Sequence, residues 1–580
     1  MSRRLQETYR QLLEAESGLS PLPWGGRLSV ALVCPSTYHQ GMSNLGVQMV
    51  YAMLNSLPAT RCERFFLPPP GDLEEHRRCG VPLLSLETGR PIVDFDLIAF
   101  SISFENDYLN LPPLFDLLQI PLFRRERDDK YPLLLCGGVC AFLNPEPLAE
   151  VMDLFAIGEA EPILPAVIEL LQSRCDVPRG ELLDDLSALP GVYVPEHYAV
   201  DYDEDGLPSY RPVAGGQAKV TRQWARNIDQ SMATSCILTP RTEFADMRLI
   251  EVSRGCPRAC RFCAAGFIYR PFRQHSLEVL TAKLDEFTPV ARTGLVAAAV
   301  TDSEALVQFG RTIQGGGGEV SVSSVRIDAI SAAEVAMLAD SGHKTLALAP
   351  EAGSQRLRDL LNKGIDEEQV LAAVAMIAQG GIPNLKLYFM VGLPGEVDED
   401  VEAIVCLTEK IRRRWEEIGR GVGRLGRITL SVNPFVPKPW TPLQWAPMVR
   451  RGELEKKYRL LQKRLRTMPN VEMQCESLRA AEIQGLFARG DRRTARLLPL
   501  VAAGKGLKAA CREAGLTVDF YLHRYRSEQE VFPWEVVDLG IDRTHLWREH
   551  QEAMNFRLGH PCAPGCGRCG CNCGSSVIDS

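Results

Sequence analysis

Residues 248–266 read RLIEVSRGCPRACRFCAAG, a short apolar segment that leads directly into three closely spaced cysteines. The segment has the length and composition of a buried strand. Apolar runs alternate with amphipathic stretches from here to residue 450, which predicts six strand–helix units. Such a repeat indicates a partial (β/α)6 barrel, in which the chemistry lies at the carboxyl ends of the strands. The three cysteines follow the first of these strands.

These cysteines, Cys256, Cys260 and Cys263, form a C-x3-C-x2-C motif. Three thiolates suit a [4Fe-4S] cluster that leaves one iron without a protein ligand, because a closed cluster takes four cysteines. Structural zinc also takes four ligands, and no fourth cysteine or histidine follows within ligand spacing unless His275 folds back. An iron with an open site can bind a substrate or a cofactor.

The aromatic residue before the third cysteine, Phe262, completes a motif that resembles the signature of the radical S-adenosylmethionine (SAM) superfamily. The resemblance implies that SAM chelates the open iron through its amino and carboxylate groups, with Phe262 close by. It also implies that one electron from the cluster cleaves SAM to a 5′-deoxyadenosyl radical, which abstracts hydrogen from the substrate. This chemistry requires a one-electron donor of the flavodoxin or ferredoxin type as a partner.

Polar residues follow the later strands of the expected barrel, and the resemblance assigns several of them to SAM. Ser323 and Arg326 follow the third strand. Glu351 ends the fourth, where a carboxylate can accept two hydrogen bonds from ribose hydroxyls. The usual Gly-Gly-Glu turn after the second strand is absent, so Asp302 or backbone carbonyls would hold the amino group of SAM. The alternative for each residue is a strand-end polar group that bonds to the local backbone.

Residues 27–174 show an earlier alternation of buried strands and helices, which predicts a Rossmann-like parallel sheet. This region resembles the cobalamin-binding domain that precedes the radical barrel in one subgroup. By that resemblance Ser101, Gly137 and Gly138 contact cobalamin. The D-x-H-x-x-G turn of domains that use a histidine ligand is replaced by STYHQGMSNLG, with no Asp two residues before His39. Either cobalamin binds without that histidine, or the domain holds another ligand or none.

Four further segments complete the expected organisation. They are an N-terminal helix within residues 1–26, an irregular linker at 175–247, a basic and mostly helical region at 451–555, and a cysteine-rich tail at 556–580. The tail holds five cysteines, Cys562, Cys566, Cys569, Cys571 and Cys573. They predict a second metal site, which would be zinc if structural or an auxiliary iron–sulfur cluster if it carries electrons or binds substrate.

The composition excludes several classes of protein. With 580 residues, 45% hydrophobic and 24% charged, the chain is too long for a single small module and too apolar for gross disorder. No run of about eighteen apolar residues predicts a membrane span, and the N-terminus does not read as a secretion signal. We therefore expect a cytoplasmic protein with no membrane partner, in which clustered cysteines serve metals more often than disulfides.

The charge is unevenly distributed. The formal net charge is −8, yet residues 409–526 hold 26 Lys and Arg against 11 Asp and Glu. Such asymmetry favours a polyanionic partner, since phosphate neutralisation supplies most non-specific affinity for nucleic acids. Structured RNA is the candidate, and the alternative is that the basic residues form solvated helix faces.

These features predict a radical SAM enzyme that transfers a methyl or methylthio group to an unactivated carbon, with RNA as a candidate substrate. One alternative is a radical SAM enzyme that acts on a small metabolite or peptide without cobalamin. An alternative of another class is a non-catalytic iron–sulfur sensor or scaffold protein. The polar residues at the strand ends argue against that last class, because a sensor has no use for them.

Overall fold

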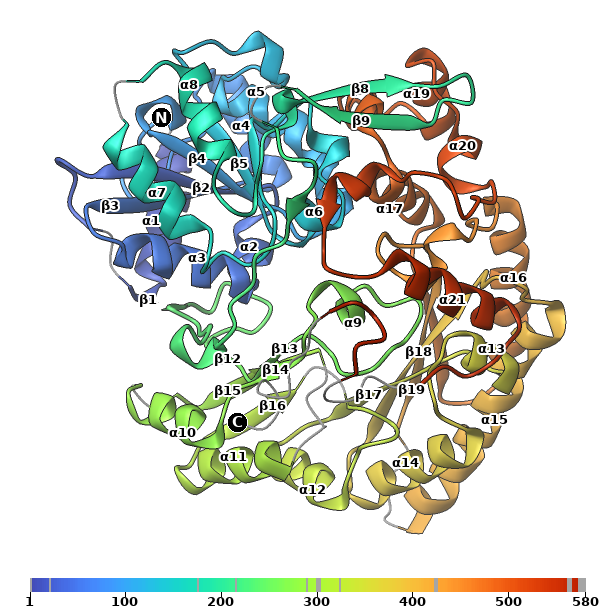
Figure 1. The fold of residues 1–580 in the computed structure, drawn as a ribbon. Coiled ribbons are helices and arrows are strands. Elements are labelled where there is room, and N and C mark those ends of the chain that lie inside the picture. The colour runs from blue at the N-terminus through green and yellow to red at the C-terminus, as the bar shows by residue number, and fades with distance from the viewer. Residues whose placement is uncertain are drawn as a thin grey trace.

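The computed structural model describes two α/β units and a C-terminal region that packs beside both (Figure 1). The described residues are 3–19, 22–174, 177–213, 216–287, 290–298, 304–322, 325–421, 426–560 and 566–571. In Figure 1 the N-terminal unit, drawn in blue to teal, lies above the barrel unit, drawn in green to orange. The predicted α/β fold class is confirmed.

The N-terminal unit is a six-stranded sheet in the order β3-β2-β4-β5-β6-β7. Its strands are β2 (Leu28–Cys34), β3 (Thr60–Phe66), β4 (Leu97–Ser101), β5 (Leu133–Gly137), β6 (Leu154–Ala156) and β7 (Val192–Tyr193). All pairs are parallel except β6 with β7. The strand order reverses between β2 and β4, and ligands of Rossmann-like sheets bind at this switch point, outside the carboxyl ends of the strands.

Helices cover both faces of this sheet, so its strands are buried on two sides and are mostly apolar. The edge strand β3 differs, because its buried residues include Arg61, Glu63 and Arg64. The helices of this unit are α1 (Arg3–Glu14), α2 (Tyr38–Met42), α3 (Leu45–Ser56), α4 (Pro70–Cys79), α5 (Leu111–Leu118), α6 (Val139–Leu143), α7 (Leu164–Ser173) and α8 (Arg179–Ser187). Helix α7 shows the physical pattern, because its buried residues Leu164, Val167, Ile168 and Leu171 recur at helical spacing on one face.

The second unit is the predicted partial barrel. Its parallel strands are β12 (Arg248–Glu251), β15 (Arg292–Val296), β16 (Glu319–Val322), β17 (Thr345–Glu351), β18 (Asn384–Val391) and β19 (Ile428–Pro434). One backbone hydrogen bond, from Val325 N to Ala347 O at 3.3 Å, connects the first three strands to the rest. The helices on the outside are α10 (Leu277–Asp285), α11 (Glu304–Gly315), α12 (Ala332–Asp340), α13 (Gln355–Leu360), α14 (Glu367–Gln379) and α15 (Asp398–Gly421).

The parallel array continues into the region that the sequence predicts to be mostly helical. Strand β20 (Val471–Cys475) pairs in parallel with β19 and adds a seventh strand. The rest of the region is helical, with α16 (Arg451–Leu465), α17 (Leu478–Arg489), α18 (Leu497–Ala502), α19 (Leu507–Glu513), α20 (Val518–Leu522) and α21 (Arg543–Met554). The C-terminal region is therefore joined to the barrel through a shared sheet.

The segment predicted as an irregular linker contacts other parts of the chain through short strands. Strand β11 (Ile237–Leu238) pairs with β1 (Ser17–Gly18), and β10 (Val220–Thr221) pairs with β21 (Val537–Asp538). A hairpin of β8 (Tyr198–Tyr202) and β9 (Pro208–Pro212) lies between β7 and β10 in the chain. These pairings tie the segment to both ends of the protein.

One continuous hydrophobic cluster extends through all three regions. It includes Phe100 of the N-terminal sheet, Phe389 of the barrel and Phe487 of α17. The rings of Tyr108 and Phe487 meet edge to face with centroids 5.6 Å apart. This shared core fixes the two strand-end edges relative to each other. None of the described helices has the length and apolarity that crossing a membrane requires.

Candidate functional site

The three motif cysteines lie on a loop of residues 255–264, here called the cluster loop, between β13 (Ser253–Arg254) and α9 (Ala265–Ile268). The loop opens at Gly255, which has φ +84°. A Cβ there would lie 2.7 Å from the carbonyl oxygen of Tyr269, so only glycine fits this turn. The backbone thus leaves the barrel strand sharply and places the cysteines at its carboxyl end.

The three thiols are close enough to affect one another's ionisation. Cys260 is buried, and Cys256 and Cys263 are half-buried. Burial, together with negative charge on Cys260 and Cys256, raises the pKa of the Cys263 thiol to about 11, although the backbone amides of Gly266 and Ala265 lower it. Among the described side chains, no three His, Cys, Asp or Glu residues surround one point as ligands of a single ion would. The set fits a cluster, in which thiolates bind different iron atoms.

A buried arginine inside the motif holds the cluster loop in place. The side chain of Arg261 is fully buried and donates to Glu549 Oε2 at 3.0 Å and to the Arg557 carbonyl at 2.7 Å. It also donates to the carbonyls of Asp359 and Leu360 at the end of α13. These contacts clamp the loop between α13 and α21. The side chain of Phe262 turns into a small apolar cluster with Leu361 and Phe435 among its members.

Glu351 lies beside the cluster loop in an uncommon backbone conformation. Its φ is +66°, in the left-handed region that costs a non-glycine residue on the order of 1–3 kcal/mol. The register between β17 and β18 shifts at this point. The Glu351 carboxylate accepts from Lys363 Nζ at 3.0 Å, with side-chain exposures of 13% and 12%. The strained conformation and the buried ion pair together fix the direction of the carboxylate.

Lys363 connects the predicted SAM residues to the cysteines. Burial alone would lower the pKa of Lys363, but the carboxylate of Glu351 and the thiol of Cys260 outweigh it and raise the pKa. The ammonium group is therefore charged and lies within electrostatic reach of both. Sequence reasoning missed this residue.

Arg326 reaches the same area from the third barrel strand. It pairs with Asp328 at 2.8 Å, and Asp328 also pairs with Arg258 of the cluster loop at 3.4 Å. The structure thus brings Arg326, Glu351 and the motif cysteines together at one end of the barrel. The predicted contacts at Asp302 and Ser323 lie outside the described residues.

A cavity of about 600 Å³ opens between the carboxyl ends of the two sheets. From the N-terminal unit its walls include Ser101, Gly137 and Gly138, the three residues predicted to contact cobalamin. From the barrel they include Gly255 and Ala265, which flank the cluster loop. The cavity reaches into the sheet as far as side chains on β2, β5, α3 and α7, which are Leu32, Leu135, Val50 and Leu164. One space therefore connects the cluster loop to the switch point of the N-terminal sheet.

Gly137 and Gly138 of this wall differ in what a side chain would meet. A Cβ on Gly138, which has φ +93°, would lie 2.5 Å from the carbonyl oxygen of Ile102, so the backbone itself requires glycine. A Cβ on Gly137 would meet nothing closer than 4.0 Å, because it would face open space. Gly137 is thus the glycine that leaves room for a ligand. No histidine is among the described lining residues, and His39 is exposed on α2.

Buried ion pairs form the charged wall of the cavity, where the two units meet. Arg254 of β13 lies 2.8 Å from each of Glu159 and Glu161, which follow β6, and 2.8 Å from Glu251. Arg273 adds a second contact to Glu159 at 2.7 Å. Of these residues, Glu159, Glu161, Glu251 and Arg254 line the cavity, so this wall is acidic.

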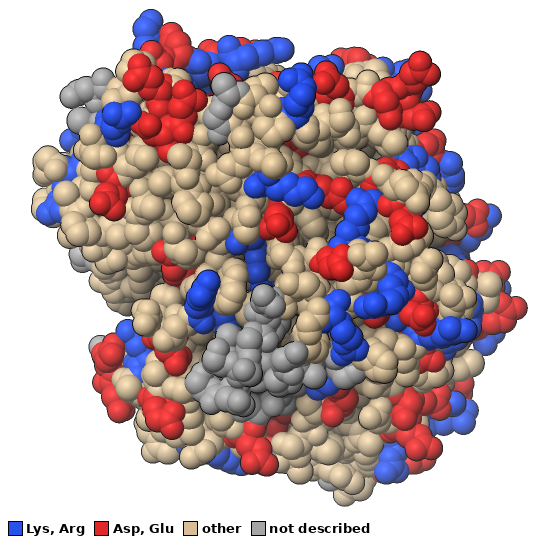
Figure 2. Space-filling view, viewed as in Figure 1, with Lys and Arg blue, Asp and Glu red and all other residues tan. Residues whose placement is uncertain are grey.

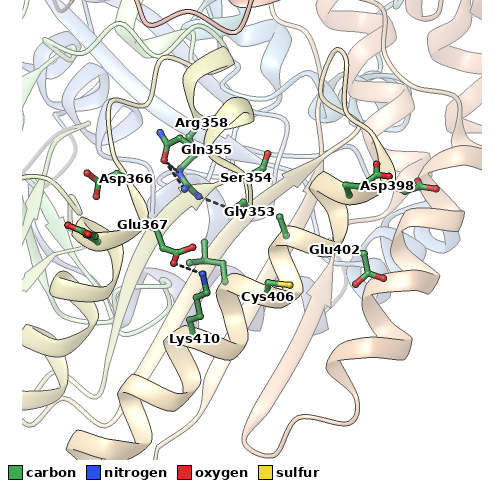
Figure 3. Close-up of a pocket in the computed structure, with 14 residues that line it drawn as sticks. Gly353, Ser354, Gln355, Arg358, Asp366, Glu367, Asp398, Glu402, Cys406 and Lys410 are labelled. Carbon is green, nitrogen blue, oxygen red and sulfur yellow. Dashed lines mark hydrogen bonds and ion pairs between the residues drawn. The ribbon is translucent and has the colours of Figure 1, made fainter.

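A larger groove, of about 1000 Å³, lies on the outside of the barrel (Figure 3). It runs between α15 and the segment from α13 to α14. Its polar side chains are largely engaged with one another, as Lys410 with Glu367 and Arg358 with Gln355 show. None of the motif cysteines lines it. The groove is therefore separate from the site at the strand ends.

The C-terminal tail lies beside the cluster loop and α9, since Cys566 and Cys569 line a small cavity together with Ala259 and Phe267. Of its five cysteines, Cys566, Cys569 and Cys571 are described, and Cys562 and Cys573 lie outside the described residues. The backbone N–H of Asp542 donates to the Cys569 carbonyl at 2.8 Å, which fixes the tail to the start of α21.

Comparisons with known proteins agree with this arrangement. Two family models match the chain, "Radical SAM proteins, N-terminal" over residues 46–195 and "Radical SAM superfamily" over residues 250–407. The uncharacterized protein MJ0966 of Methanocaldococcus jannaschii is 27% identical over 513 residues, which cover 86% of this chain and 97% of that protein. The uncharacterized methyltransferase PH0819 of Pyrococcus horikoshii is 24% identical over 260 residues, 43% of this chain and 54% of that one.

Among solved structures, the cobalamin-dependent S-adenosylmethionine radical enzyme OxsB with aqua-cobalamin bound aligns with a TM-score of 0.44 and 16% identity. The alignment covers 66% of this chain and 52% of that chain. The first match covers the N-terminal sheet from α3 to β7, and the second covers the barrel from β12 into α15 and includes the whole cysteine motif. The chain belongs to the radical SAM superfamily.

Proposed function

We propose that this radical SAM enzyme transfers a methyl or methylthio group to an unactivated carbon, using a [4Fe-4S] cluster, SAM and cobalamin. The observation that carries the proposal is the single cavity that joins the cluster loop to the switch point of the N-terminal sheet. The similarity to a methyltransferase supports group transfer. When bound, the cluster and SAM supply radical chemistry, and cobalamin supplies a carrier for the methyl group.

Cys256, Cys260 and Cys263 would hold the cluster. The chain contributes three thiols on one loop, the clamp of Arg261, and the cation of Lys363 beside Cys260. A buried cation near thiolates favours their charged form, which is the form that binds metal. Holding the loop rigidly would fix the three thiols relative to the cavity that Gly255 and Ala265 line.

Glu351 and Arg326 would hold SAM, and Asp302 and Ser323 are further proposed contacts. The fixed carboxylate of Glu351 can accept hydrogen bonds from ribose hydroxyls, and Arg326 supplies a cation for a carboxylate. Phe262 would contribute by packing beneath the loop, since its ring contacts apolar side chains there.

Ser101, Gly137 and Gly138 would line a corrinoid site. The open space at Gly137 and the apolar depth of the cavity fit a bulky, mostly uncharged ligand. Since no described lining residue is a histidine, cobalamin would bind here without a histidine ligand from this wall.

Two observations favour a neutral or cationic substrate, such as a small metabolite or a peptide, over RNA. The charged wall of the cavity is acidic, so it repels phosphate. The basic residues of 409–526 are also widely engaged in ion pairs with acidic partners from elsewhere in the chain. Examples are Lys410 with Glu367, Lys457 with Glu396, Arg464 with Glu402, Arg492 with Glu146 and Arg524 with Glu530. Figure 2 shows Lys and Arg interspersed with Asp and Glu over the visible face.

Anaerobic reconstitution tests the core of the proposal. The wild type should bind iron and sulfide and, on reduction, release 5′-deoxyadenosine from SAM. A Cys256→Ala, Cys260→Ala, Cys263→Ala variant should do neither. Its matched control replaces Cys406 and Cys475, which are exposed and far from the motif in sequence. Cleavage of SAM by the motif variant would disprove the assignment of the cluster.

The corrinoid and substrate proposals have separate tests. Protein purified after expression with ample cobalamin should show a corrin absorption spectrum, and a colourless protein would contradict that part. Binding to structured RNA should be weak and without preference at physiological salt. Tight binding that falls steeply as salt rises would instead favour RNA as the substrate.

A further inference from the structure

Beside the cluster loop lies a small, partly open cavity that the proposed reaction does not use. Its volume is about 20 Å³, enough for roughly one water-sized occupant. Cys566 and Cys569 of the tail, with His545 of α21 and His560, line one side of it. Ala259, Phe267 and Arg270, from the cluster loop and α9, line the other. Thiols and imidazoles are the side chains that bind soft and borderline metals.

The tail is held firmly at this cavity. Cys569 and Cys571 are 2% and 8% exposed. The Cys571 thiol donates to the carbonyl of Gly540 at 3.3 Å, and Gly570 packs against Asp542. A segment of Cys and Gly buries little apolar surface of its own, so its placement needs an additional source of free energy, which a bound metal can supply.

Positive charge also lines this cavity. Arg270 from the side of α9 and Arg568 of the tail are both among its lining residues. A cation close to cysteines favours the thiolate, which is the form that binds metals.

We propose that the tail forms a second metal centre at this cavity, with Cys566 and Cys569, which line it, and the neighbouring Cys571 as thiolate ligands, and with His545 or His560 as the source of a nitrogen ligand. Only the role of this second centre rests on the proposed function, because the centre would lie next to the radical cluster. As described, the tail thiols do not surround a single point, a property that they share with the three motif cysteines. An iron–sulfur centre would relay electrons, whereas zinc would fix the tail to the cluster loop.

The position explains why such a centre would lie here. Ala259 stands between Cys256 and Cys260, and Phe267 belongs to the helix after Cys263. Figure 1 draws the red C-terminal segment beside α9. The tail therefore contacts the cluster loop and α9 through residues that do not line the central cavity, and an electron could enter here without opening that cavity to water.

Reciprocal variants test the proposal. The tail variant is Cys566→Ser, Cys569→Ser, Cys571→Ser, the motif variant is the triple alanine described above, and Cys406→Ser, Cys475→Ser is the control. Each is reconstituted anaerobically with iron and sulfide, and separately with zinc, and its metal content is measured. The motif variant should keep metal that the tail variant loses, and the tail variant should keep the absorption of the radical cluster.

The outcomes separate the two proposals. Metal in the motif variant, whether iron or zinc, supports the second centre, and its identity is read from metal analysis and electron paramagnetic resonance. A motif variant without metal under both conditions overturns it. Equal metal in the tail variant and the wild type also overturns it. Retained cluster in the tail variant shows that this variant folds. A separate result would disprove the assignment of the radical cluster: iron-dependent SAM cleavage by the motif variant at the level of the wild type.

A measurement on the unmodified protein guards against misfolding of the variants. Native wild type is alkylated before and after treatment with a chelator, and modified cysteines are mapped by mass spectrometry. Cys566, which is half-buried, should react only after metal removal, whereas exposed Cys79 should react in both samples. Equal reactivity of Cys566 in both samples would contradict the proposal.

Discussion

The two walls of the central cavity are built on different physical principles. On the barrel side, buried charges that lie behind the lining fix the cluster loop and its surroundings: Arg261 clamps the loop and Lys363 pairs with Glu351, and none of these three residues lines the cavity itself. On the N-terminal side, the wall is mostly apolar or small, apart from Asn44 and the carboxylates of Glu159 and Glu161 at the seam, and Gly137 leaves space. Buried charges specify orientation at a cost in desolvation, whereas an apolar hollow specifies shape. The barrel wall is thus suited to a charged ligand held in one pose, and the other wall to a bulky neutral one.

The strongest test of the buried charges that hold the cluster loop is Arg261→Met. Removing this guanidinium leaves Glu549 and three carbonyls without their donor in a buried setting. The free energy of unfolding should fall by about 4 kcal/mol, and the iron content after reconstitution should fall with it. Chemical denaturation and iron analysis measure the two effects.

The matched control is Arg292→Met, because Arg292 also makes an ion pair, with Glu319, but its side chain is 52% exposed. Exposed pairs contribute roughly 0–1 kcal/mol. If both variants lost the same stability, buried charge would not be what organises the barrel wall.

Lys363→Met should have the next largest effect. It leaves the strained Glu351 unpaired in a largely buried position, at a cost of about 3 kcal/mol. The affinity for SAM should fall about tenfold, which corresponds to roughly 1.4 kcal/mol. Isothermal titration with SAM on reconstituted protein measures this.

Lys363→Arg should keep most of the affinity, since it preserves the charge, and Lys410→Met is the exposed control. Unchanged SAM affinity in Lys363→Met would show that the pair serves the fold alone.

Variants of Gly137 and Gly138 separate the effect of cavity shape on ligand binding from the effect of backbone strain on stability. Gly138→Ala should lower the free energy of unfolding by about 2 kcal/mol, because alanine disfavours φ +93° and its Cβ meets the Ile102 carbonyl. Gly137→Leu should change stability by less than about 1 kcal/mol while filling the cavity, so it should abolish corrin absorbance in the purified protein. Denaturation curves and absorption spectra of both variants test this contrast. Corrin binding by Gly137→Leu would place the corrinoid elsewhere.

Some of this contrast could be read from the sequence and some could not. The cysteine spacing and the strand alternation predicted the cluster loop and the barrel, because both are local patterns. Ser101, Gly137 and Gly138 are assigned by the resemblance to cobalamin-binding domains, and all three line the cavity. Lys363 was missed because its contact with Glu351 depends on a register shift and a positive φ that no local pattern signals.

Contacts between distant segments were the least predictable. The basic count over 409–526 suggested RNA, but a count cannot show that partners such as Glu146 and Glu367 lie outside that stretch. The short strand β10 pairs with β21, which lies near the other end of the chain. Such pairings follow from the packed core as a whole, so they become visible only in three dimensions.

The seam where the two walls meet gives the smallest effect and a dependence on pH. Burial alone would raise the pKa of Glu251, but hydrogen bonds from His275 and Arg254 outweigh it and lower the pKa to about 2. Glu251 therefore contributes stability that is fully present above its unfolded pKa of about 4.3 and is lost as pH falls toward about 2.

Glu251→Gln should accordingly lower the free energy of unfolding by about 1 kcal/mol at pH 7, and the difference from wild type should shrink below pH 4. Denaturation of both proteins at a series of pH values from 7 to about 3 measures it. A difference that stays constant over this range would mean that the carboxylate charge is not what couples Glu251 to Arg254. Since Arg254 also binds Glu159 and Glu161 of the other unit, the charged wall would then be held by those two pairs alone.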